Sequence, residues 1–116
     1  MTINELKDNG KFYRALLILA KKNKSISLTE TKILIAIGQN LGFEKKFCEI
    51  AISELLENEY ISEKPPRFSN PHTARSFIET GFYLALSDNN LSKEEKQWLL
   101  SVADRNEIKI DFLDSE

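Results

Sequence analysis

The 116-residue sequence contains a single cysteine, Cys48, and a single histidine, His72. One cysteine cannot form a disulfide within the chain, and neither C-x-x-C nor H-x-x-x-H spacing occurs, so both a disulfide scaffold and a zinc site are disfavoured. We expect Cys48 to be a buried, unreactive side chain. His72 follows Pro71, and we expect it to have a solvated or capping role in the first turn of a helix.

Long apolar runs and glycine motifs are also missing. No stretch approaches the roughly 20 apolar residues that span a bilayer, and the N-terminal MTINELKDNGK lacks the basic start and apolar core of a signal peptide. We therefore expect no membrane insertion and a cytoplasmic location. The four glycines form no phosphate-binding loop, and neither a G-x-S-x-G motif nor a Ser/His/Asp set is present, which predicts that the protein is not an enzyme.

Charge is unevenly distributed along the chain. Residues 1–50 carry nine Lys/Arg and five Asp/Glu, whereas residues 51–116 carry seven and thirteen, which together give the net charge of −2. The acidic balance and the absence of a basic stripe with interleaved aromatics disfavour nucleic-acid binding. Opposite charge in the two halves favours docking within the fold, onto a protein partner, or between copies in a homo-oligomer.

Apolar residues recur at helical spacing, and no run alternates as a half-buried strand does. The pattern predicts one all-α domain over residues 1–116, a compact bundle of about five to six helices. The helices are expected near residues 10–22, 28–41, 44–58, 72–87 and 93–105, with a short last turn at 110–113. Two windows, TKILIAIGQNL and EKQWLLSVAD, are apolar around most of the helix circumference and are expected at the centre of the domain.

All three prolines lie in EYISEKPPRFSNP, within residues 59–71. Proline removes a backbone donor and favours an extended conformation in the residue before it. We interpret this segment as a connector between two halves of the domain, with Phe68 packed onto the core.

The two halves, about residues 11–48 and 76–113, resemble each other. An ungapped shift of 65 residues pairs Phe12 with Phe77, Leu34 with Leu99 and Phe47 with Phe112. Because most matched positions are apolar at helical spacing, we predict two helix-loop-helix repeats related by a pseudo-twofold axis. Two copies at this period do not make a solenoid, which needs several stacked units.

The shift also pairs two serine–glutamate sets, Ser27 with Glu30 and Ser92 with Glu95. This is the spacing of a capping box, in which the serine hydroxyl accepts from the amide three residues on and the glutamate accepts from the serine amide. We predict that each set begins a helix.

The segment ALSDNNLSKEEKQWLL, residues 85–100, also has oxygen ligands for a cation. Numbered as an EF-hand from Asp88, it has lysine at the required glycine and leucine at the bidentate glutamate, so a standard EF-hand is excluded. A shorter site for calcium, magnesium or manganese remains, formed by Asp88, Asn90 and Glu95, or Glu94 in place of Glu95. The alternative is a plain turn in which Asp88 and the asparagines bond the backbone.

The segment FYLALSDNNLSKEEKQWLLSVADRNEI resembles the TerB-like family, named for a bacterial tellurite-resistance protein. The shared pattern is a helix ending in alanine, an acidic turn, an apolar residue, a cap, a glutamate and a second apolar helix. The resemblance implies a two-halved helical bundle, and it implicates Asp88 and Glu95 in divalent-metal binding. The first half departs from the pattern, because Asn23 and Lys24 replace its acidic D-G turn.

From these observations we expect a small cytoplasmic, non-enzymatic binding or accessory module of TerB-like type. A protein partner is the leading hypothesis, and a stress-associated role is what the resemblance implies. The alternative is a divalent-metal sensor that uses residues 88–95.

Overall fold

A computed structural model describes residues 3–22, 26–58, 62–87 and 91–109. These residues form helices and no strand, as predicted. The five helices are α1 (Ile3–Lys21), α2 (Leu28–Asn40), α3 (Lys45–Glu57), α4 (Pro71–Leu86) and α5 (Lys93–Arg105). The bounds of α2 to α5 agree with the sequence prediction within one residue. Helix α1 begins seven residues earlier than predicted, and the short last turn at 110–113 lies outside the described residues.

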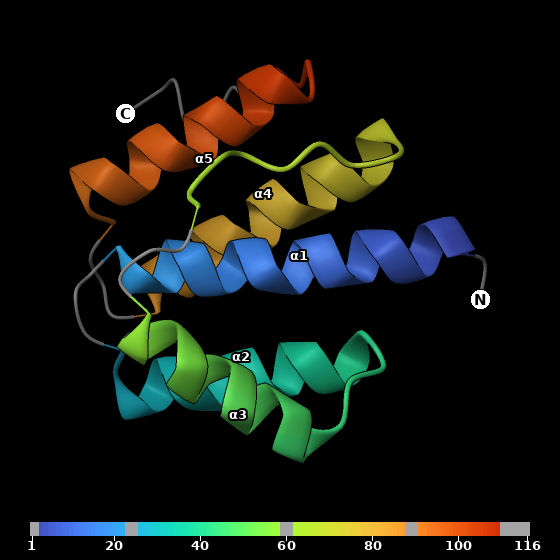
Figure 1. Ribbon diagram of the computed structural model, residues 1–116. Helices are drawn as coiled ribbons and strands as arrows, with labels where there is room; N and C mark the ends of the chain where they lie inside the picture. Colours follow the sequence, from blue (N-terminus) through green and yellow to red (C-terminus); the bar gives the residue numbers. More distant parts are fainter. Residues whose placement is uncertain (1–2, 23–25, 59–61, 88–90, 110–116) are drawn as a thin grey trace.

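Helix α1 is the central element of the bundle. Figure 1 shows it between two layers, with α2 and α3 on one side and α4 and α5 on the other, and it contacts all four. Its six residues from Ala15 to Ala20 are all buried. Because a helix between two layers has little solvent-facing surface, nearly its whole circumference there can be apolar.

The prediction that the window TKILIAIGQNL lies at the centre is wrong. In α2 only Glu30, Leu34 and Gly38 are buried, whereas Leu28 is 72% exposed. The second window is also one-sided, since α5 buries Trp98, Leu99, Val102 and Ala103 and exposes Asp104 and Arg105. Both helices belong to outer layers, and several of their other apolar residues, such as Ile33, Ile37 and Leu100, pack at the edges of the core.

Helices α2 and α5 begin in the same way. Ser27 and Ser92 have nearly identical extended backbones, and each serine hydroxyl accepts from the amide of the glutamate three residues on, at 3.0 Å for Glu30 and 3.1 Å for Glu95. Each glutamate Oε1 accepts in return from the serine amide. The two predicted capping boxes are therefore confirmed.

The two helices also end alike. After α2 the amide of Phe43 donates to the Gly38 carbonyl, and after α5 the amide of Ile108 donates to the Ala103 carbonyl, both at 2.9 Å. The chain turns at Gly42, with φ 98°, and at Glu107, with φ 57°. These are Schellman motifs, in which a residue with left-handed backbone lets amides after the helix donate to carbonyls of its last turn. The pseudo-twofold relation between the two halves stays a prediction.

The connector before α4 is extended and is fixed by side chains. Phe68 is buried and packs against Phe12 and Phe77, which confirms its predicted place on the core. Trp98 Nε1 donates to the Glu63 carbonyl at 2.9 Å. Asn106 donates to the Pro66 carbonyl and accepts from the Phe68 amide, both at 2.9 Å.

A buried carboxylate holds the far end of the connector. Asp8 of α1 accepts from the backbone amide of Ser69, and it also accepts from the Ser69 hydroxyl. Asn70 then caps α4 through the Thr73 amide, with Pro71 as the first helical residue. The path of residues 62–70 is thus determined by α1 and α5 rather than by its own backbone hydrogen bonds.

Candidate functional site

The structure describes only one of the three residues predicted to bind a metal. Asp88 and Asn90 lie outside the described residues. Glu95 is buried in the first turn of α5, where Oε1 accepts from the Ser92 amide at 3.0 Å. Its second carboxylate oxygen, Oε2, is buried and has no hydrogen-bond donor among the described residues.

The surroundings of this turn combine both signs of charge. Lys22, just after α1, forms an ion pair with Glu63 of the connector. Burial lowers the pKa of the Lys22 ammonium, and the nearby charge of Glu94 opposes this shift. The end of α1 and the start of α5 therefore lie close together. Within the described ranges, His, Cys, Asp and Glu nowhere gather in a group of three that could hold a metal ion.

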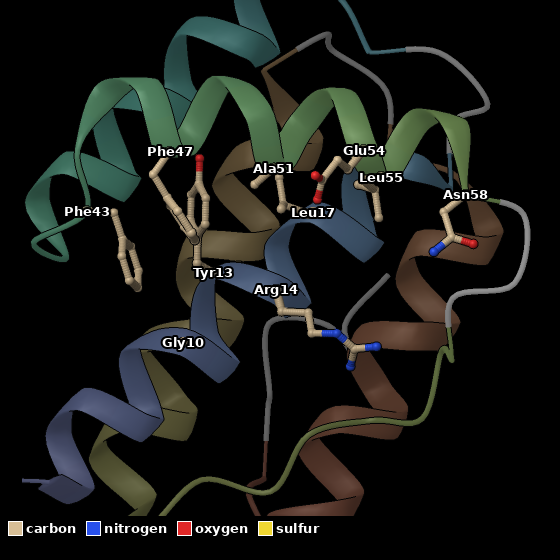
Figure 2. Close-up of a pocket in the computed structure, with 10 residues that line it drawn as sticks. All are labelled: Gly10, Tyr13, Arg14, Leu17, Phe43, Phe47, Ala51, Glu54, Leu55 and Asn58. Carbon is tan, nitrogen blue, oxygen red and sulfur yellow. The ribbon is translucent and has the colours of Figure 1, made fainter.

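A groove of about 450 Å³ lies between α1 and α3. Figure 2 shows Phe47, Ala51 and Leu55 of α3 facing Tyr13 and Leu17 of α1 across it. These positions are spaced by four or eight residues, so each set lies on one face of its helix. We call this feature the α1–α3 groove.

Aromatic rings close one end of the α1–α3 groove. Phe43 and Phe47 are stacked, with ring centroids 5.1 Å apart, and Tyr13 lies 5.6 Å from Phe43. Phe47 is nevertheless 52% exposed, and its neighbour Ile50 is 48% exposed. Phe47 is thus a position matched by the repeat that lies largely outside the core.

Two charged side chains stand on opposite walls of the α1–α3 groove. Arg14 comes from α1 and Glu54 from α3, both are exposed, and Figure 2 shows them toward the end away from Phe43. They form no ion pair with each other or with another described residue. The groove thus combines an apolar floor with one positive and one negative group that are available to a ligand.

Tyr13 links the floor of the groove to the core. Its hydroxyl donates to the Leu34 carbonyl at 2.9 Å. Burial and the neighbouring thiol of Cys48 raise the pKa of this hydroxyl. Cys48 itself is fully buried, as predicted. The Tyr13 hydroxyl and the Cys48 thiol therefore serve as structural contacts between helices.

Two other residues noted in the sequence have plain structural roles. His72 is exposed in the first turn of α4, as predicted. Trp98 packs edge-on against Phe77 in the core and bonds the connector, as its apolar window indicated.

The α1–α3 groove was not predicted from the sequence. Its walls are about 35 residues apart in the chain, so only the packing of α3 beside α1 creates it. Phe47 and Ile50 are three residues apart and share one face of α3, so the sequence gives no local signal that both are exposed.

Comparison of the chain with protein-family models, curated proteins and solved structures finds no match. None of the described helices has both the length and the apolar character that crossing a membrane requires.

Proposed function

We propose that this protein is a non-catalytic interaction module that binds an amphipathic helix of a partner protein in the α1–α3 groove. The observation that carries the proposal is Phe47, a large aromatic side chain that is half exposed beside an apolar floor. Aromatic residues next to pockets supply much of the binding energy at protein interfaces.

The shape of the groove favours a helix as its occupant. From Phe47 to Asn58, the α3 wall covers eleven residue steps, about 16 Å at the α-helical rise of 1.5 Å per residue. A partner helix of about three turns would run this length. It would place apolar side chains at positions i, i+4 and i+7 or i+8, as in other helix-in-groove complexes.

The charges on the walls constrain the partner further. An acidic residue of the partner would meet Arg14, and a basic residue would meet Glu54. Such complementarity favours one orientation of the helix, because the reversed helix would carry its acid and base to the aromatic end of the groove, away from Arg14 and Glu54. The partner chemistry is therefore an apolar helical stripe flanked by one acid and one base.

The proposal is tested with a displayed library of helical peptides carrying this pattern. Peptides selected on the wild-type protein should bind with amide chemical-shift changes confined to α1, α3 and the turn at Phe43. Ala51→Glu places a charge on the groove floor and should weaken binding at least tenfold. Tyr83→Ala is the matched control, because Tyr83 is 65% exposed on α4 and does not line the groove.

Selected peptides that bind Ala51→Glu as tightly as the wild type would contradict the proposal. Self-association is measured in parallel by sedimentation. A dimer that Ala51→Glu dissociates would identify a second copy of this chain, and not a foreign helix, as the occupant of the groove.

The TerB-like resemblance and its two related halves belong to the same proposal. The matching caps and endings of α2 and α5 support the relation between the halves at the level of local structure. A stress-associated, cytoplasmic role is what the resemblance adds, and measuring the growth of a deletion strain under tellurite or oxidative stress tests it.

Divalent-metal sensing by Asp88, Asn90 and Glu95 is the second candidate. The observation that favours it is the buried Oε2 of Glu95, which has no donor among the described residues, because a buried carboxylate oxygen is stabilised by a cation or a donor. Amide spectra should then shift saturably near residues 86–96 with calcium, magnesium or manganese, but not in Asp88→Ala. Unchanged spectra at millimolar metal would rule this candidate out.

A further inference from the structure

A second pocket, of about 360 Å³, lies between α1, the connector and the last turn of α5. Its charged lining residues are all cationic: Lys11, Arg14, Lys64, Arg67 and Arg105. No acidic side chain among the described residues lines it, although the chain as a whole is acidic. We call this feature the basic pocket.

Two of the five cations are engaged by backbone carbonyls. Lys11 Nζ donates to the Arg67 carbonyl at 3.0 Å, and Arg67 Nη1 donates to the Arg105 carbonyl at 3.4 Å. The second contact lies at the C-terminal end of α5, where the helix dipole favours positive charge. Fold stability therefore accounts for Lys11 and Arg67, but not for the rest of the cluster.

Arg14, Lys64 and Arg105 form no ion pair with any described residue. Glu63 and Asp104 are adjacent in sequence to Lys64 and Arg105, but neither lines the pocket, and Glu63 pairs with Lys22. Like charges in one cleft repel each other and together create a positive potential that attracts anions. The pocket thus carries positive charge that no acidic side chain of the described ranges pairs with.

The remaining lining is mostly apolar. Ala15 and Ile18 of α1 are buried at its base, and Pro65 and Pro66 of the connector form its side. Hydrogen bonds from Asn106 and Trp98 hold the connector in place, so this wall is formed before any ligand arrives. A preformed apolar surface beside fixed cations suits a ligand with a flat apolar part and an anionic part.

We propose that the basic pocket binds a small organic diphosphate, with its phosphates on Arg14, Lys64 and Arg105 and its apolar ring against Pro65 and Pro66. A diphosphate carries about three negative charges at neutral pH, which matches the three cations without a protein partner. Guanidinium groups bind phosphate oxygens through paired N–H donors, which makes two arginines a favourable set.

The test uses ADP, inorganic pyrophosphate and adenosine as probes in calorimetric titrations of the full chain. ADP should bind saturably and more tightly than pyrophosphate, and adenosine should not bind. Affinity for ADP should fall several-fold as sodium chloride rises from about 50 to about 300 mM, because salt screens the attraction. Amide shifts should be confined to residues 11–18, 62–67 and 103–106.

The variant Lys64→Glu reverses one unpaired charge and should weaken ADP binding at least tenfold. Arg75→Gln is the matched control, since Arg75 is exposed on α4 and does not line the pocket. Arg105→Gln provides a second, milder variant, and thermal unfolding confirms that each variant is folded. None of these variants changes a residue that lines the α1–α3 groove, so peptide binding and ADP binding can fail separately.

Three results would overturn the proposal. The first is no saturable binding of either phosphate probe at millimolar concentration. The second is ADP binding that Lys64→Glu leaves unchanged. The third is a single-stranded oligonucleotide whose affinity increases with length and exceeds that of ADP, which would make the pocket part of a nucleic-acid surface instead.

Discussion

Helices α2 and α5 begin and end in the same way but are covered differently. Both start at a serine–glutamate capping box and finish in a Schellman motif. Helix α2 packs on α1 and on another helix, α3, whereas α5 packs on α1 and α4 and is covered on a further side by the extended connector. The difference teaches that local signals determine where these helices lie along the chain, and that a few particular side chains determine what packs against them.

For α2 the decisive residue is Gly38. A β-carbon there would collide with Cys48 Sγ of α3 and would lie 2.9 Å from Cζ of Tyr13. The matching residue of α5 is Ala103, which is buried and already carries a β-carbon. For α5 the decisive residues are Trp98 and Asn106, whose counterparts in α2 are the apolar Ile33 and Leu41. An amide and an indole N–H can hold a polypeptide backbone, and aliphatic groups cannot.

Gly38→Ala should have the largest effect on this comparison. Overpacking a buried contact costs about 1–3 kcal/mol, and Cys48 is fully buried with no room to move. We expect a loss of about 2–3 kcal/mol in the free energy of unfolding, measured by urea titration. Adding Cys48→Ala should recover part of the loss. Gly81→Ala is the control, because its β-carbon would meet the ends of two leucine side chains that can move aside.

Asn106→Ala should have the next largest effect on the free energy of unfolding. It removes the donor to Pro66 and the acceptor for the Phe68 amide, so we expect a loss of about 2 kcal/mol. Hydrogen exchange should accelerate in the connector and not in α3. Asn40→Ala, at an exposed position in the last turn of α2, should change stability by less than about 0.5 kcal/mol. Equal losses in the two variants would remove the contrast between the coverings.

The two capping serines should give smaller and matched effects. Ser27→Ala and Ser92→Ala should each cost about 1 kcal/mol. The values should agree within about 0.5 kcal/mol and should be the same with and without a metal chelator, because a cap acts through hydrogen bonds alone. A much larger loss at Ser92, seen only when metal is present, would show that the start of α5 does more than cap a helix.

Tyr13, which packs beside Gly38 of α2, should make the stability of the fold depend on pH. Its pKa is raised in the folded state, so its contribution is complete below its unfolded pKa of about 10 and is lost as pH rises further. Unfolding measured at pH 8 and pH 11 should therefore show an alkaline decrease in stability that Tyr13→Phe reduces. At neutral pH the same variant should cost about 1 kcal/mol for the lost bond to Leu34. An identical alkaline slope in both proteins would contradict the assignment.

The smallest expected effect is an increase in stability. Glu107 has a left-handed backbone that costs a non-glycine residue about 1 kcal/mol, whereas Gly42 occupies the same place after α2 without that cost. Glu107→Gly should stabilise the protein by about 0.5 kcal/mol, since the added freedom of the unfolded chain offsets part of the relief. Calorimetric thermal unfolding would detect this gain, and a lower melting temperature for Glu107→Gly would contradict backbone strain at Glu107.

The sequence predicted the helices well because their signals are local. Ser27, Ser92 and the connector prolines mark boundaries through hydrogen bonds and dihedral limits within a few residues. It failed for the first seven residues of α1, where MTINELKDNG has few apolar residues and a glycine. It also misplaced the centre, because an apolar circumference does not reveal which helix has neighbours on both sides.

The two candidate binding features depend on contacts that are distant in sequence. Arg14 and Glu54 oppose each other only after α3 packs beside α1. Lys11, Lys64 and Arg105 meet only because Trp98, Asn106 and Asp8 hold the connector. Dividing the charges between the two halves of the chain concealed the basic pocket, since its cations come from both halves. Of the predicted metal residues, Glu95 has its expected cap, and Asp88 and Asn90 stay predictions.

The connector has one further consequence, for the dynamics of the protein. The amides of Phe68 and Ser69 donate to side chains of Asn106 and Asp8, not to neighbouring backbone. We therefore expect both amides to be protected from exchange although they belong to no helix, and both hydrogen bonds break when the connector separates from α1 and α5. Two amides in a segment without regular structure would thus report a single opening motion, the one that would also dismantle a wall of the basic pocket.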